Sequence, residues 1–182
     1  MILDSGSRQE FETGAVRDIQ EGKGRCDLLP LDVVAIGITH SPVLARIRDF
    51  KTTGEYSHLY RALEAFCSSR EWDVGTMLLE VSKQFEDGAK KYGENNWQKG
   101  IPTKRYIDSA VRHYLKWCRG DEDEPHDRAF CWNVIACIWT CLHKPELHDY
   151  QRVPCPVCGK SILSSDDVCP HCLVHVGEVN HG

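Results

Sequence analysis

The sequence has no excess of basic residues and no long apolar run. Its 182 residues include 22 lysines and arginines against 27 aspartates and glutamates, a formal net charge of −5. A protein that coats nucleic acid needs a basic surface to neutralise phosphates, so this balance argues against strong nucleic-acid binding. No stretch approaches the roughly 18 uncharged apolar residues of a membrane-spanning helix, so no membrane partner is expected.

A secretion signal is also lacking at the start. Residues 1–14, MILDSGSRQEFETG, contain no charged start followed by an apolar block. We therefore expect a cytoplasmic protein, in which cysteines stay reduced. The chain is long enough to bury a sizeable core, so its stability does not require disulfides.

Alternating apolar and polar residues, which predict strands, form no useful pattern before residue 150. Apolar residues recur instead at helical spacing in 57–69, 74–93, 105–120 and 121–144. Asp73 is placed to cap the second of these helices and Gly93 to end it, while Pro42 must interrupt any helix within 31–50. The predicted fold class is all-α, a helical bundle within residues 1–150.

Residues 1–30 are rich in glycine and in mixed charges and show little periodicity. The glycines and the closing Leu28, Leu29 and Pro30 favour an ordered loop that docks on the helices. A solvated tail remains the alternative.

The ten cysteines fall into two groups. Six are scattered in hydrophobic context, where a reducing compartment predicts small buried apolar side chains. The other four form two Cys-x-x-Cys pairs with ten residues between them: Cys155, Cys158, Cys169 and Cys172. Such pairs on tight turns place four thiolates around one structural Zn²⁺, which predicts a zinc ribbon over 151–182, joined to the helices by a polar tether.

Several carboxylates are candidates for a second metal site. Glu124 and Asp127 are three residues apart, so they share one side of a helical turn. Glu80 and Glu86 lie on the 74–93 helix, and Asp108 lies on the 105–120 helix. Carboxylates gathered from facing helices suit Mg²⁺, which prefers oxygen ligands. The alternative for the acids near residue 124 is that they only favour a helix N-terminus and face water.

Basic and aromatic residues surround these acids in the sequence. A triphosphate needs lysine or arginine opposite a metal-bound carboxylate. Asn96 and Trp97 offer an amide and a stacking face for a base, although Trp97 is equally well explained as core. The predicted substrate-binding residues are Arg17, Lys23, Arg25, Lys90, Tyr92, Asn96, Trp97, Arg112 and His113.

Four segments together resemble a known family: GAVRD…EGKGRCDLLP, EDGAKKYGENNWQKGIP, DSAVRHYLKWCRG and DEPHDRAFCWN. The family is the phage and prophage dATP/dGTP diphosphohydrolases, related to the MazG-like all-α nucleoside triphosphate pyrophosphohydrolases. The resemblance covers about residues 5–150 and leaves the ribbon outside. It implies an α-helical oligomer that cleaves a deoxypurine nucleoside triphosphate between its α- and β-phosphates and needs Mg²⁺ or Mn²⁺.

The sequence departs from the MazG-like pattern at one point. That pattern has Glu-Glu-x-x-Glu on one helix and Glu-x-x-Asp on the next. Glu124 and Asp127 satisfy the second string, but the first is absent, and Glu80, Glu86 and Asp108 are its nearest substitutes. The predicted metal ligands are therefore Glu80, Glu86, Asp108, Glu124 and Asp127, and the predicted catalytic residues are Glu86, Asp127 and Lys91.

Two other functions fit the same sequence: a catalytically inactive nucleotide sensor and an interaction module built on the ribbon. The segment 130–142, FCWNVIACIWTCL, is apolar nearly all round. A helix without a polar face is normally buried on every side, which predicts a dimer or tetramer built partly on it. The alternative is that the ribbon and the first helices cover it.

Overall fold

The computed structural model describes residues 7–164 and 166–176. Its larger part is a bundle of five helices longer than ten residues: α2 (Pro42–Thr53), α3 (Ser57–Arg70), α4 (Val74–Tyr92), α5 (Thr103–Arg119) and α6 (His126–His143). Short turns of helix connect them: η1 (Cys26–Leu28), α1 (Leu31–Val33), η2 (Val34–Ile38), η3 (Asn96–Lys99) and η4 (Pro145–Leu147). The predicted all-α fold is confirmed.

Local sequence signals set the ends of these helices. The Asp73 carboxylate accepts a hydrogen bond from the Thr76 N–H at 2.7 Å and caps α4, as predicted. Pro42 is the first residue of α2, and the Ser41 hydroxyl before it accepts from the Leu44 N–H. Gly93 ends α4 with a φ of 90°, a conformation that favours glycine.

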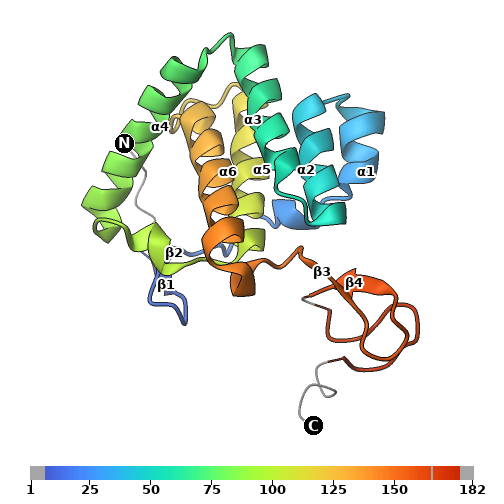
Figure 1. Cartoon of the computed structure of the whole chain (residues 1–182). Helices are drawn as coiled ribbons and strands as arrows, with labels where there is room; N and C mark the ends of the chain where they lie inside the picture. Colours follow the sequence, from blue (N-terminus) through green and yellow to red (C-terminus); the bar gives the residue numbers. More distant parts are fainter. Residues whose placement is uncertain (1–6, 165, 177–182) are drawn as a thin grey trace.

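Helix α6 lies at the centre of the bundle, with α3, α4 and α5 around it (Figure 1). Its Phe130 ring packs 4.6 Å from the ring of Phe66 on α3, and both side chains are fully buried. This burial explains why α6 is apolar nearly all round. Helices of the same chain therefore bury most of the α6 surface that a second subunit was expected to bury. The dimer or tetramer stays a prediction.

The N-terminal segment forms a two-stranded antiparallel hairpin, β1 (Arg8–Glu10) with β2 (Val16–Asp18). These three-residue strands are too short for alternation to reveal them. The hairpin docks on the bundle, because the Asn96 side chain bonds both the N–H and the C=O of Val16 at 3.0 and 2.8 Å. Over residues 8–30 the segment is an ordered, docked loop, as favoured from the sequence.

A second hairpin, β3 (Arg152–Pro154) with β4 (Ser161–Leu163), begins the C-terminal ribbon. The connection before it is packed rather than solvated. The His148 ring stacks on Phe50 at 5.4 Å, and the Tyr150 carbonyl approaches Gly54 so closely that a Cβ there would lie 2.5 Å away. The expected tether is thus held against α2, and the domain boundary after residue 150 stays a prediction.

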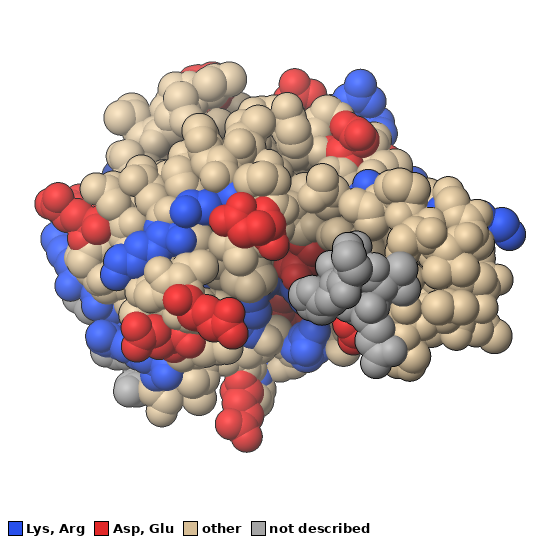
Figure 2. All heavy atoms as spheres, turned by 60° about the horizontal axis from the view of Figure 1, so that its bottom comes forward, with Lys and Arg blue, Asp and Glu red and all other residues tan. Residues whose placement is uncertain are grey.

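Among the described residues, no helix is long and apolar enough to cross a membrane. Acidic and basic side chains are interspersed on the face drawn in Figure 2, without a broad basic field.

Candidate functional site

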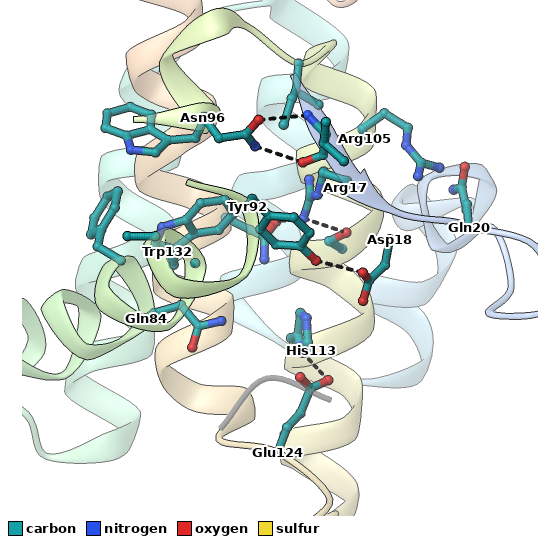
Figure 3. Close-up of a pocket in the computed structure, with 18 of the residues that line it drawn as sticks. Arg17, Asp18, Gln20, Gln84, Tyr92, Asn96, Arg105, His113, Glu124 and Trp132 are labelled. Carbon is teal, nitrogen blue, oxygen red and sulfur yellow. Dashed lines mark hydrogen bonds and ion pairs between the residues drawn. The ribbon is translucent and has the colours of Figure 1, made fainter. Parts of the chain in front are cut away.

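A cavity of about 840 Å³ opens between β2, the C-terminal half of α4, η3, α5 and the start of α6 (Figure 3). This volume is in the range that holds a small-molecule ligand. Its lining includes nine predicted site residues: Arg17, Lys23, Glu86, Tyr92, Asn96, Trp97, Arg112, His113 and Glu124. The fold therefore brings together nine of the fifteen residues that the sequence predicted for nucleotide chemistry, from three separate parts of the chain.

Arg17 places a buried positive charge in this cavity. Its Nη2 donates to Asn133 Oδ1 at 2.7 Å and to Ser109 Oγ at 3.3 Å. Its Nη1 is buried and has no hydrogen-bond partner among the described residues. Burial lowers the pKa of Arg17 below the ordinary value for arginine. An unpaired buried cationic donor is costly, so the geometry suits a bound anion.

Four more cationic side chains line the same cavity: Lys23, Arg105, Arg112 and Lys116. Burial lowers the pKa of Lys23 and of Arg105, and Arg105 Nε is buried without a partner among the described residues. Arg112 is held in place by Asp108, whose carboxylate lies 2.8 Å from Nη1. Together with Arg17, these residues form the cationic side of the site.

The other side of the cavity is aromatic. Trp132 and Gln84 lie opposite Asp18 and Gln20 in the view of Figure 3. Trp132 Nε1 and Gln84 Oε1 are both buried, and neither has a hydrogen-bond partner among the described residues. They therefore offer one donor and one acceptor to a polar ring.

Trp97 and Asn96, predicted to contact a base, have structural partners already. The Trp97 ring packs between Phe85 and Trp139, with centroids 5.2 and 4.9 Å away, so it serves the core as well as the cavity wall. Asn96 uses its amide on the backbone of Val16. Sequence reasoning missed Trp132 and Gln84, because an apolar residue on α6 and a polar one on α4 fit the helical pattern without any special role.

Two cations predicted to bind substrate, Lys90 and Arg25, and the predicted catalytic residue Lys91 do not line the cavity. Lys90 pairs with Glu86 on the exposed side of α4. Lys91 lies 2.9 Å from Asp18, which also accepts from the Tyr92 hydroxyl at 2.7 Å. Arg25 pairs with Asp27 outside the cavity wall.

The predicted Mg²⁺ ligands are dispersed. Glu80 pairs with Lys83. Asp108 is buried and accepts from Arg112 and from the Cys26 N–H, while Asp127 lies 3.1 Å from Arg70. No three of the five predicted carboxylates have oxygen atoms within 4.8 Å of one another. They are not gathered around a common position for Mg²⁺, and only Glu86 and Glu124 line the cavity.

A different group is gathered at the cavity wall. His113 Nδ1, on α5, lies 3.0 Å from Nδ1 of His126, the first residue of α6. Glu124 Oε1 lies 3.6 Å from the first of these atoms and 3.7 Å from the second. His126 was not among the predicted site residues, since only the fold brings it to His113.

The four ribbon cysteines also converge. Cys155 Sγ lies 3.8 Å from Cys172 Sγ, and Cys158 Sγ lies 3.7 Å from Cys169 Sγ. Zinc–sulfur bonds of about 2.3 Å in a tetrahedron separate the sulfurs by about 3.8 Å. The four thiols therefore fit one zinc ion, as the spacing predicts.

Comparison with known proteins supports the resemblance over one part of the chain. Residues 72–150 match the model of a family described as dATP/dGTP diphosphohydrolase, N-terminal. No curated protein and no solved structure matches the sequence. The match contains α4, α5 and α6 but neither the N-terminal hairpin nor the ribbon. The match confirms the resemblance to the dATP/dGTP diphosphohydrolase family for residues 72–150.

Proposed function

We propose that the cavity binds a deoxypurine nucleoside triphosphate and hydrolyses it to the monophosphate and pyrophosphate. The observation that carries this proposal is the buried Arg17 guanidinium, whose Nη1 points to no partner among the described residues. A phosphate oxygen would satisfy this donor with a charge-assisted hydrogen bond. The family name supplies the choice of dATP or dGTP and of the bond that is cleaved.

The cationic side of the cavity suits a triphosphate. Arg17, Lys23 and Arg112 come from the N-terminal segment and from α5, so they approach one ligand from different directions. Arg17 and Arg112 share Ser109 Oγ as an acceptor, at 3.3 and 3.1 Å, which fixes the two guanidinium groups beside each other. Two cations held this close favour a multiply charged anion between them.

The aromatic side suits a purine. Adenine and guanine both carry ring-nitrogen acceptors and an exocyclic amino donor at their edges. Trp132 Nε1–H and Gln84 Oε1 are the complementary donor and acceptor, and both are buried. The Phe85 and Trp132 rings, which are 5.9 Å apart and nearly edge to face, add an apolar surface on which a base can pack.

The proposed reaction is attack by water on the α-phosphorus. The bond from this phosphorus to the α–β bridging oxygen breaks, and pyrophosphate leaves with the electron pair. Cations around the phosphates stabilise the charge that develops on the leaving group. Glu86 is our candidate to accept the proton of the attacking water, because it lines the cavity. The hydrogen bond from Lys90 lowers its pKa and so keeps the carboxylate in the ionised form that can accept a proton. Asp127 and Lys91 do not line the cavity, and both are held in ion pairs, so the proposal does not depend on them.

The test is to incubate the full chain with each deoxy- and ribonucleoside triphosphate, with a divalent metal, and to measure pyrophosphate and monophosphate. We expect equal amounts of both products, formed fastest from dATP or dGTP. Glu86→Gln should slow turnover by about 100-fold or more, the range for loss of a general base. Glu64→Gln, an exposed residue on α3, is the matched control.

Other outcomes select the other candidates. Tight nucleotide binding without product would indicate an inactive sensor that uses the same cavity. Neither binding nor product would leave an interaction module built on the ribbon, and the proposed hydrolase would be wrong.

A further inference from the structure

The three atoms of the cluster at the cavity wall form a triangle of the size that a metal ion requires. The sides measure 3.0, 3.6 and 3.7 Å between His113 Nδ1, His126 Nδ1 and Glu124 Oε1. A point equidistant from all three lies about 2.0 Å from each, which is the length of metal bonds to imidazole nitrogen and carboxylate oxygen. The three atoms are therefore spaced as the ligands of one ion would be.

A second, independent feature is the carboxylate behind one of the rings. His126 Nε2 lies 2.7 Å from Asp123 Oδ1, so this nitrogen carries the proton and donates it. The other nitrogen, Nδ1, is then left with its lone pair directed at His113. Histidines that bind metals have this arrangement, in which an outer carboxylate fixes the tautomer and increases the basicity of the ligating nitrogen.

Burial favours the neutral form of the His113 imidazole. Burial, followed by the charges of His126 and of Arg112, lowers the pKa of His113 well below its ordinary value. His126 is 2% exposed. The negatively charged groups beside the two histidines are Glu124 and Asp123. Asp123 is also paired with Lys116 at 2.7 Å. Neutral imidazole is the form that binds metals, and without a metal the two rings must share a single proton between facing nitrogens.

We propose that His113, Glu124 and His126 bind a divalent transition-metal ion of the kind that prefers imidazole, such as Fe²⁺, Co²⁺, Ni²⁺ or Zn²⁺, rather than Mg²⁺. Two nitrogens and one oxygen suit these ions, whereas Mg²⁺ prefers oxygen throughout. Three protein ligands also leave positions for water or for a ligand oxygen. His113 and Glu124 line the cavity, so the ion borders it. Contact between the ion and a phosphate rests on the proposed function, but the metal site itself does not.

The test uses the full chain with zinc in the ribbon. It is titrated with Co²⁺, and the visible absorption of the bound ion is recorded together with metal content after gel filtration. We expect one Co²⁺ per chain in addition to the ribbon zinc, without the thiolate charge-transfer band that cobalt in the ribbon would give. Mg²⁺ in tenfold excess should not displace it.

Variants assign the signal to these residues. His113→Gln and Glu124→Gln should each abolish the added Co²⁺ absorption, and Asp123→Asn should weaken binding by about 10–100-fold, as removal of an outer carboxylate does. The controls are Glu122→Gln, an exposed residue on the same loop as Glu124, and His143→Gln, an exposed histidine at the far end of α6. Far-UV circular dichroism checks that each variant is folded. If the His113 variant does not fold, the Glu124 variant still decides the test, because Glu124 lies on a loop.

The two proposals fail separately. Absence of Co²⁺ absorption from the wild type, or its persistence in both Glu124→Gln and His113→Gln, would overturn the metal site. Co²⁺ binding that needs Glu124, with no pyrophosphate formed from any nucleotide, would leave the metal site standing and overturn the hydrolase. If the wild type binds no Co²⁺ and turnover with Mg²⁺ is unchanged in Glu124→Gln, the hydrolase would stand and the metal site would be overturned.

Discussion

Arg17 on β2 donates to Asn133 on α6 over 2.7 Å, although 116 positions separate the two residues in the sequence. This hydrogen bond joins the N-terminal hairpin to α6, which lies within the matched residues 72–150. The guanidinium also lies over the rings of Tyr106 and Trp132, at 5.1 and 5.6 Å from their centroids. The cavity is thus completed by a segment outside residues 72–150, and its function depends on both parts of the chain.

We therefore predict that Arg17→Gln weakens nucleotide binding more than it destabilises the fold. The loss of one buried charge-assisted contact corresponds to about 1.5–3 kcal/mol, or roughly 10–150-fold in Kd. Titration of the variant with dGTP measures this change. Arg8→Gln on β1, a residue outside the cavity lining, is the control and should bind within about twofold of wild type. Equal weakening in both variants would show that only the stability of the hairpin matters.

The aromatic side of the cavity, where we propose that the purine binds, gives a second prediction. Trp132→Phe keeps an aromatic ring but removes the buried Nε1–H, which has no partner among the described residues. If this group donates to a purine, KM for dATP or dGTP should rise by about 3–10-fold, the value of one neutral hydrogen bond. Steady-state kinetics measure it, with Trp139→Phe on the same helix as control. An unchanged KM would remove Trp132 from base recognition.

The helices could be predicted from the sequence because their signals are local. Asp73, Pro42 and Gly93 act within one turn of chain, and each has the structural role that its chemistry predicts. The two cysteine pairs are equally local, since each pair forms its own turn. These features need no knowledge of which helices become neighbours.

The site could be predicted only in part, because its members meet through tertiary packing. His113 and His126 belong to different helices and face each other only because α5 and α6 pack side by side. Conversely, the spacing predicted that Glu124 and Asp127 share a helical turn, but α6 begins only at His126, so Glu124 lies on the preceding loop. The Asp127 carboxylate pairs with Arg70 on α3. Spacing cannot show which of several nearby charges a side chain will meet.

The buried histidine predicts a pH dependence of stability. The folded-state pKa of His113 is depressed, so below its unfolded pKa near 6.5 the unfolded chain binds a proton that the folded chain does not. The free energy of unfolding should therefore fall as the pH decreases from 7 to 5, by at most about 1.4 kcal/mol per unit from this residue. Urea unfolding at both pH values, with zinc in the ribbon and no other metal, measures the slope. His113→Gln should flatten it, and an equal slope in the variant would assign the effect elsewhere.

The ribbon should be dispensable for turnover. None of the residues that line the cavity comes from the segment after residue 150. We predict that truncation after Tyr150, which keeps its packing on Phe50, retains most pyrophosphate release while zinc content falls by one ion per chain. Metal analysis and product measurement on the same preparation check both. A folded truncation without activity would mean that the ribbon completes the site.

The last prediction concerns the two turns that hold the ribbon cysteines. In the first turn the Gly159 N–H donates to the Cys155 carbonyl, and in the second the Leu173 N–H donates to the Cys169 carbonyl, both at 2.9 Å. Glycine adopts its φ of 72° freely, but Leu173 must hold a φ of 60°, which is unfavourable for a residue with a Cβ. The Leu173 side chain is 77% exposed, so little burial is lost when it is removed. Leu173→Gly should therefore stabilise the zinc-bound ribbon by about 0.5–1 kcal/mol, or roughly 2–5-fold in zinc affinity measured by competition with a chelator. Gly159→Leu at the matching position of the first turn should weaken zinc binding by a similar or larger factor. Weaker binding in Leu173→Gly, or stronger binding in Gly159→Leu, would show that the two turns are not equivalent.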